Sequence, residues 1–76
     1  MNAIHITTAK MMLERPEPVD LLVFKQNGEL MHLEQCIGLR YDDYTGTRRV
    51  KLLASGQVRQ IRDALIVRIN GMSVFL

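Results

Sequence analysis

The sequence predicts a mainly β protein: a small, strongly bent β-barrel of about five to six strands with a short N-terminal helix. Short apolar segments follow one another closely after Pro18, and turn residues separate them. Asn-Gly pairs at 27–28 and 70–71 are typical of tight hairpins. A chain of 76 residues can fill only one modest core. We therefore expect a single domain over residues 1–76, with the helix within 1–15 and the barrel over 19–76.

The helix is predicted first along the chain. Either Thr7 or Thr8 can cap it, because a hydroxyl there accepts a hydrogen bond from a free backbone amide of the first turn. Residues 9–14 continue it with good helix formers. Pro16 and Pro18 then end the helix and favour an extended chain.

Six β-prone segments follow the helix. They are VDLLVFK (19–25), ELMHLEQCIGL (29–39), RRVKLLA (48–54), QVRQIRD (57–63), ALIVRI (64–69) and MSVFL (72–76). In the third segment Val50 and Leu52 alternate with Arg49 and Lys51, which is typical of a strand with one wet face. Gly38, near the end of the long second segment, indicates a bend or bulge.

A curled sheet suits a chain of this size. Six short strands left flat would expose two unpaired edges, whereas curling the sheet covers most of the edges and encloses the aliphatic side chains. Glycines at 38, 46 and 56 stand where such a barrel needs corners. A four-stranded sheet with a packed helix is the competing architecture.

Composition excludes several classes of site. Cys36 is the single cysteine, so there is no internal disulfide and no cysteine pair for a metal, and His5 and His32 are too isolated for a zinc site. We expect Cys36 to be a small buried hydrophobe. The chain shows neither a secretory signal nor an apolar run long enough to cross a bilayer, so we expect a cytoplasmic protein without membrane contact and without a cofactor.

Basic residues gather in the second half of the chain. Residues 1–37 hold three basic and five acidic side chains, whereas residues 38–76 hold seven basic and three acidic ones. Arginine dominates the second set, and its planar fork of donors suits phosphate. If the segments 48–51 and 59–62 lie side by side, their basic residues form a phosphate-binding stripe, and the candidates are Arg48, Arg49, Lys51, Arg59 and Arg62.

The same arginines have a simpler interpretation as a solvated barrel face that protects strand edges from aggregation. Arg59 and Arg62 are three positions apart and should point to opposite faces unless a bulge intervenes. One of these two arginines is expected to pair with Asp63 or with an acidic residue of the N-terminal part.

Two tyrosines flank the turn beside this stripe. Tyr41 and Tyr44 are candidates for stacking on unpaired bases, which is how single-stranded nucleic acids are commonly held. The alternative is that they cap the end of the barrel and hydrogen-bond a turn. Asp42 and Asp43 between them diverge as neighbours and match neither an acid/base pair nor a metal site.

The stretch VRQIRDALI (58–66) resembles the arginine, hydrophobe, arginine, isoleucine pattern near the end of WYL-type domains, carried here by Arg59, Ile61, Arg62 and Ile66. The segment VFKQNGELMHLEQC (23–36) is similar to the opening hairpin of their small phage-type members. The Trp-Tyr-Leu motif itself is absent. This resemblance implies an SH3-like, Sm-like barrel, an association with nucleic acid, ligand sensing or transcription, and anion contacts at Arg59 and Arg62. The chain also looks like small proteins of bacterial mobile elements.

Catalysis is not expected, because the sequence holds no Ser-His-Asp or Cys-His set at usable spacing, no P-loop and no GxGxxG motif. Two non-enzymatic functions remain. The first is a nucleic-acid-associated or regulatory module that uses the arginine stripe. The second is a structural or adaptor protein that pairs with another chain, or with a second copy of itself, through an uncovered C-terminal strand MSVFL (72–76).

Overall fold

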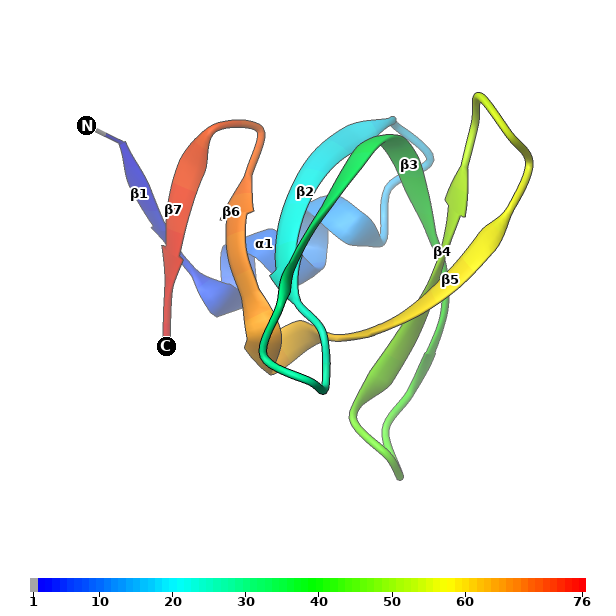
Figure 1. Ribbon diagram of the computed structural model, residues 1–76. Helices are drawn as coiled ribbons and strands as arrows, with labels where there is room; N and C mark the ends of the chain where they lie inside the picture. The colour runs from blue at the N-terminus through cyan, green and yellow to red at the C-terminus, as the bar shows by residue number, and fades with distance from the viewer. Residues whose placement is uncertain (1) are drawn as a thin grey trace.

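The computed structural model describes residues 2–76 and confirms a mainly β fold with a short N-terminal helix (Figure 1). The elements are β1 (Ala3–His5), α1 (Ile6–Leu13), β2 (Val19–Phe24), β3 (Leu30–Asp42), β4 (Thr47–Leu52), β5 (Val58–Arg62), the 3₁₀ turn η1 (Asp63–Leu65), β6 (Ile66–Ile69) and β7 (Met72–Phe75). The six predicted segments all carry strands. β1 is an additional strand that the sequence did not predict, so the described sheet has seven strands.

The seven strands form one sheet in the order β1-β7-β6-β2-β3-β4-β5. β5 and β6 are consecutive in the chain but four positions apart in the sheet, which would be about 19 Å if the sheet were flat. Only η1 joins them, and four Cα steps span at most about 15 Å. The sheet must therefore curl, and Figure 1 shows β5 swinging across the front of the molecule to reach β6.

Helix α1 lies behind the sheet and closes one side of the core (Figure 1). Its N-cap is His5, whose Nδ1 accepts a hydrogen bond from the backbone amide of Thr7 at 3.2 Å. The prediction of a threonine cap was wrong. The helix begins at Ile6, so His5 is the N-cap, and its imidazole nitrogen takes the role expected of a threonine hydroxyl. Ala9 and Leu13, four residues apart on one face, are the buried residues of the helix.

Gly38 allows this helix to approach the sheet. A Cβ placed on Gly38 would overlap the carbonyl oxygen of Leu13 and lie 2.9 Å from the carbonyl carbon. The last turn of α1 therefore rests directly on the backbone of β3. The pairing of β3 with β4 shifts register between Gly38 and Tyr41, so the predicted bend or bulge is present at this point.

The core is almost entirely aliphatic and lies between α1 and the concave side of the sheet. Its buried hydrophobic residues are Ala9, Leu13, Val19, Leu21, Val23, Leu33, Cys36, Val50, Ile61, Ile66 and Ile69. They come from the helix and from five of the strands, which is what a curled sheet around one core requires. Within residues 2–76, no helix has the length and apolar character needed to cross a bilayer.

The C-terminal hairpin forms as predicted but does not leave an open strand. Asn70 and Gly71 both have positive φ, as a tight hairpin turn requires, and β6 and β7 pair in antiparallel fashion. On its other side β7 pairs in parallel with β1, with Ile4 opposite Val74. The expectation that MSVFL is uncovered was therefore wrong: the first residues of the chain occupy its free edge.

Candidate phosphate-binding face of strands β3, β4 and β5

The register of β4 and β5 decides which basic side chains lie together. Directly opposite residues of antiparallel strands point to the same side of the sheet. Arg49 lies opposite Gln60, and Lys51 lies opposite Val58. All four of these side chains are exposed, so Arg49 and Lys51 stand on the convex, solvent side of the sheet. Along β4 they are two residues apart, or about 6.6 Å.

Arg62 joins the same side. It lies opposite Thr47, which has the same parity as Arg49 along β4. Arg40 joins it from β3, because the bulge between Gly38 and Tyr41 places an extra residue against β4, and Arg40 and Arg49 line one groove. We call this surface the outer face, and define it by its four cations Arg40, Arg49, Lys51 and Arg62.

Arg48 was predicted as a phosphate contact, but it is buried. Arg48 and Asp63 are only 2% and 1% exposed, respectively. Arg48 Nη2 donates to Asp63 Oδ2 at 3.1 Å, and Nε donates to Oδ1 at 3.2 Å. The prediction that Asp63 pairs with Arg59 or Arg62 was wrong. Arg48 shares its parity with Val50, and that alternation turns it toward the core.

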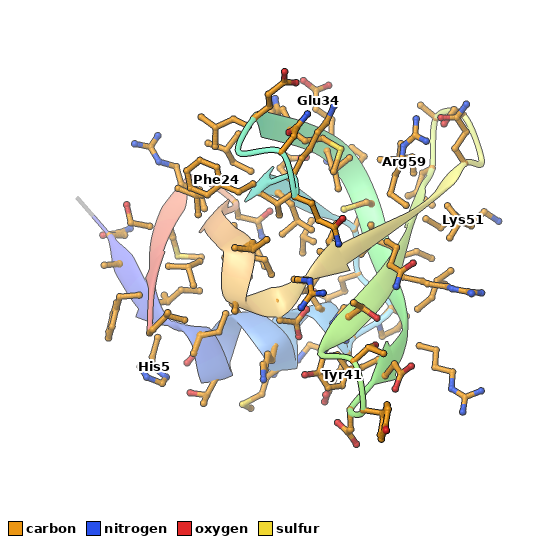
Figure 2. All side chains as sticks on the ribbon, turned by 60° about the horizontal axis from the view of Figure 1, so that its bottom comes forward. His5, Phe24, Glu34, Tyr41, Lys51 and Arg59 are labelled. Carbon is orange, nitrogen blue, oxygen red and sulfur yellow. The ribbon has the colours of Figure 1, made fainter. Side chains whose placement is uncertain are left out.

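Arg59 stands apart from the outer face. It lies opposite the buried Val50, so it points to the concave side of the hairpin, and its Nη2 donates to Gln57 Oε1 at 2.7 Å. Figure 2 shows Arg59 on the side of the β4–β5 hairpin nearer the body of the sheet and Lys51 on the far side. Arg59 and Arg62 therefore point to opposite faces, as their spacing predicted.

The two tyrosines do not act as a pair. Tyr41 lies opposite Arg48 on the inner side and is half-buried, with the Arg48 guanidinium 4.9 Å and Lys10 Nζ 5.3 Å from its ring centre. Tyr44 is 97% exposed at the tip of the β3–β4 turn. Its backbone amide donates to Asp42 Oδ1 at 2.9 Å, so Asp42 builds the turn that presents this ring.

A groove of about 560 Å³ runs beside Tyr44 on the outer face. Arg40, Thr47, Arg49 and Gln60 line it from three strands. Asp42 and Asp43 line it at the turn, so the two cations of the groove, Arg40 and Arg49, stand against two carboxylates, and Lys51 and Arg62 lie outside it. The excess of positive charge sits on β4 and β5, away from the turn.

The single cysteine of the chain lies in the core. Cys36 is fully buried, and its Sγ donates to the Val19 carbonyl at 3.3 Å. Burial, and secondarily the nearby Asp20 carboxylate, raises the pKa of the thiol from 9.0 to about 11, so it stays protonated at neutral pH. Among residues 2–76 there is no group of three or more His, Cys, Asp or Glu side chains placed to hold a metal ion.

Sequence reasoning missed Arg40 because its position depends on the bulge. The hint of a bulge at Gly38 was present, but its effect on the next residues needs the register with β4. The parity of Arg48 with Val50 and Leu52 was visible and would have placed Arg48 on the buried side. Comparison of the chain with protein-family models, with curated proteins and with solved structures finds no match.

Proposed function

We propose that this protein is a non-enzymatic module that binds the phosphate backbone of nucleic acid through its outer face. The observation that carries this proposal is the register: it gathers Arg49, Lys51 and Arg62 on one side of two neighbouring strands. Arg40 extends the group onto β3. Cations at strand spacing on an exposed sheet can neutralise successive phosphates and release their counterions.

Tyr44 supports single-stranded nucleic acid as the form that is bound. Its ring is exposed and lies beside the groove that Arg40 and Arg49 line. Single-stranded nucleic acids are commonly held by a positive groove that follows the backbone and by aromatic rings on which bases stack. One free ring beside Arg40 and Arg49, with Lys51 and Arg62 further along the outer face, provides both parts of that arrangement.

The proposal also includes the finer description of the fold, a strongly bent SH3-like or Sm-like barrel of the WYL type. The short η1 link between β5 and β6 and the bulge after Gly38 support a sheet that curls on itself. The alternative function, an adaptor that pairs through the C-terminal strand, would first require β1 to be displaced, because β7 lies between β6 and β1.

Replacing two outer-face cations should weaken binding and flatten its salt dependence. In the double variant Arg49→Gln/Lys51→Gln, two phosphate contacts are lost. The slope of log K against log salt should then fall by about 1.4 for a single strand. Fluorescence anisotropy of a labelled single-stranded oligonucleotide, measured over a series of salt concentrations, gives both quantities.

The matched control is Arg59→Gln/Arg68→Gln, which removes the same charge from exposed positions outside the outer face. Its salt slope should stay close to that of the unmodified protein. Equal losses in the two double variants would mean that only net charge matters. Absence of binding at low ionic strength would remove the proposed function.

A further inference from the structure

Strand β5 has one edge without a partner. It is the last strand in the sheet order, and among the described strands it pairs only with β4. Every residue of β5 except Ile61 is exposed. Arg59 is exposed even though it points to the concave side, so both faces of the strand are open to solvent there. Figure 1 shows the turn of the β4–β5 hairpin standing away from the rest of the sheet. Such an edge is a template for another extended chain.

The hydrogen-bond phase decides which backbone groups of β5 are free. The Leu52 amide donates to the Gln57 carbonyl at 2.8 Å, and the β4–β5 register, continued by one pair, places these two residues directly opposite each other. Hydrogen-bonded pairs alternate with non-bonded pairs along an antiparallel ladder. Every second residue of β5, counted from Gln57, is therefore bonded to β4. The amides and carbonyls of the residues between them point to the free edge, and these residues are Val58, Gln60 and Arg62.

A groove of about 610 Å³ lies between the second half of β5 and the β2–β3 hairpin. This volume is within the roughly 300–1,000 Å³ of ligand sites in proteins. The hairpin side is open as well, because β3 pairs with β4 only from Cys36 onward and residues 30–34 have β2 as their one partner among the described strands. The sheet is therefore not zipped together across this groove, and an extended chain can lie beside β5.

The groove is apolar on its core side. Met31, Ile61 and Leu65 line it there. Met31 lies opposite the buried Val23, and Ile61 lies opposite the buried Arg48, so both side chains point to the concave side of the sheet. A side chain of an added strand that points to the same side would therefore meet aliphatic groups.

Positive charge surrounds the free edge. Residues 47–62 contain five basic side chains and no acidic one. Asp63 neutralises Arg48, and the other four are exposed. Lys25 and Arg62 line the groove, and none of its lining residues among those described is a carboxylate. A second copy of this edge would bring like charges together, whereas an acidic chain would be attracted.

The backbone and the charge together select the class of ligand. Amides and carbonyls that alternate at strand spacing match the backbone of another extended peptide, which supplies both acceptors and donors. A phosphate backbone offers acceptors for the amides but no N–H groups for the carbonyls. A peptide therefore satisfies this edge better than nucleic acid does, and the surrounding cations favour an acidic one.

We infer that the free edge of β5 binds an extended acidic peptide as an added antiparallel strand. Residues directly opposite each other in two such strands point to the same face. The peptide residue opposite Ile61 is then apolar and enters the groove, and the residues opposite Arg59 and Arg62 are acidic. The inference does not depend on the proposed function, because Arg49 and Lys51 do not line this groove.

The test is a ¹H–¹⁵N NMR titration of the whole protein with the acetylated and amidated peptide Ser-Glu-Val-Thr-Glu-Thr-Ser. Its first glutamate is designed to lie opposite Arg62, and its valine opposite Ile61. Binding at a Kd of about 1 mM or tighter should shift the backbone signals of Val58 and Gln60 and leave that of Ser73 on β7 in place. Lysine in place of both glutamates should weaken binding at least roughly fivefold, because like charges then lie opposite each other.

Two N-methylated peptides test the hydrogen bonds without any change in the protein. A methyl group on the amide of the central threonine, opposite Gln60, removes a donor that faces β5. Binding should weaken at least roughly fivefold. A methyl group on the amide of the valine, opposite Ile61, falls on a group that faces away from β5. This second peptide is the matched control and should keep most of its affinity.

Two variants test the protein side. Gln60→Pro removes an amide that β4 does not use, so it should weaken the peptide at least roughly fivefold while the fold persists, and Gln60→Ala is its control. Arg59→Gln should weaken the peptide more than Arg68→Gln does, since Arg68 is exposed on β6. Signal dispersion in the spectra verifies that each variant is folded.

Several outcomes would overturn the inference. Backbone signals of Val58 and Gln60 that stay unshifted up to about 10 mM peptide would do so. Equal weakening by the two N-methylated peptides would do so as well. Shifts of the same signals when the protein alone is concentrated would identify a second copy as the occupant. None of these results affects the outer face, which the Arg49→Gln/Lys51→Gln comparison tests.

Discussion

Replacing Gly38 with alanine should cost about 3 kcal/mol, the upper end of the usual range for inserting an atom into a packed interior. The added Cβ would overlap the Leu13 carbonyl oxygen, which belongs to the helix backbone and cannot rotate away. Either α1 must lift from β3 or the sheet must open. A domain of this size has a net stability of only about 3–5 kcal/mol, so the variant should keep only about 0–2 kcal/mol at room temperature.

Urea unfolding followed by circular dichroism measures this loss as a lower midpoint at an unchanged slope. Gly56→Ala is the matched control. A Cβ at Gly56 meets nothing within 4 Å, and its positive φ should cost only about 1–2 kcal/mol. If Gly38→Ala were no more destabilising than Gly56→Ala, the close contact between α1 and β3 would not exist in solution.

Neutralising Asp63 should have an effect of at least the same size. Asp63→Asn leaves the buried guanidinium of Arg48 without its charged partner, and breaking a buried ion pair in this way costs about 3–5 kcal/mol. Tyr41 and Glu14 cannot replace the carboxylate. The Tyr41 ring carries no charge, and Glu14 lies 4.0 Å from Arg48 Nη2 with most of its side chain in solvent.

The double variant Arg48→Met/Asp63→Leu should recover most of that loss, because it removes both buried charges and leaves apolar side chains in the core. The required double-mutant cycle compares the urea midpoints of Arg48→Met alone, of Asp63→Leu alone and of the double variant. Glu14→Gln is the control and should cost less than about 1 kcal/mol, as exposed pairs do. Additive losses from Arg48 and Asp63 would contradict a direct buried pair.

Much of the fold could be predicted because its signals are local. Alternation along each strand and the Asn-Gly turns depend on neighbouring residues, and these gave six of the seven strands. β1 was missed because Ala3–His5 becomes a strand only by pairing with residues 73–75, about 70 positions away. The helix cap, predicted at Thr7 or Thr8, was misplaced by two or three residues because the Thr7 amide donates to His5, which is the capping side chain.

The candidate site was predictable only in part, and for a similar reason. Arg49 and Lys51 alternate with apolar residues, as in a strand with one solvent-exposed face. These two residues of the outer face could therefore be predicted from the sequence. The burial of Arg48 depends on a carboxylate 15 residues later, which approaches only after β5 has crossed to η1. Arg40 and the groove beneath the β2–β3 hairpin depend on a bulge and on the curl of the sheet.

The most direct test of the outer face is an NMR titration of the arginine Nε–Hε signals with a single-stranded oligonucleotide at low salt. The geometry predicts shifts at Arg40, Arg49 and Arg62. The signal of Arg48 should stay in place because Asp63 already holds its Nε–H, and Arg68 on β6 should not respond. Shifts of equal size at Arg68 and Arg49, or the largest shift at Arg68, would contradict phosphate binding on the outer face.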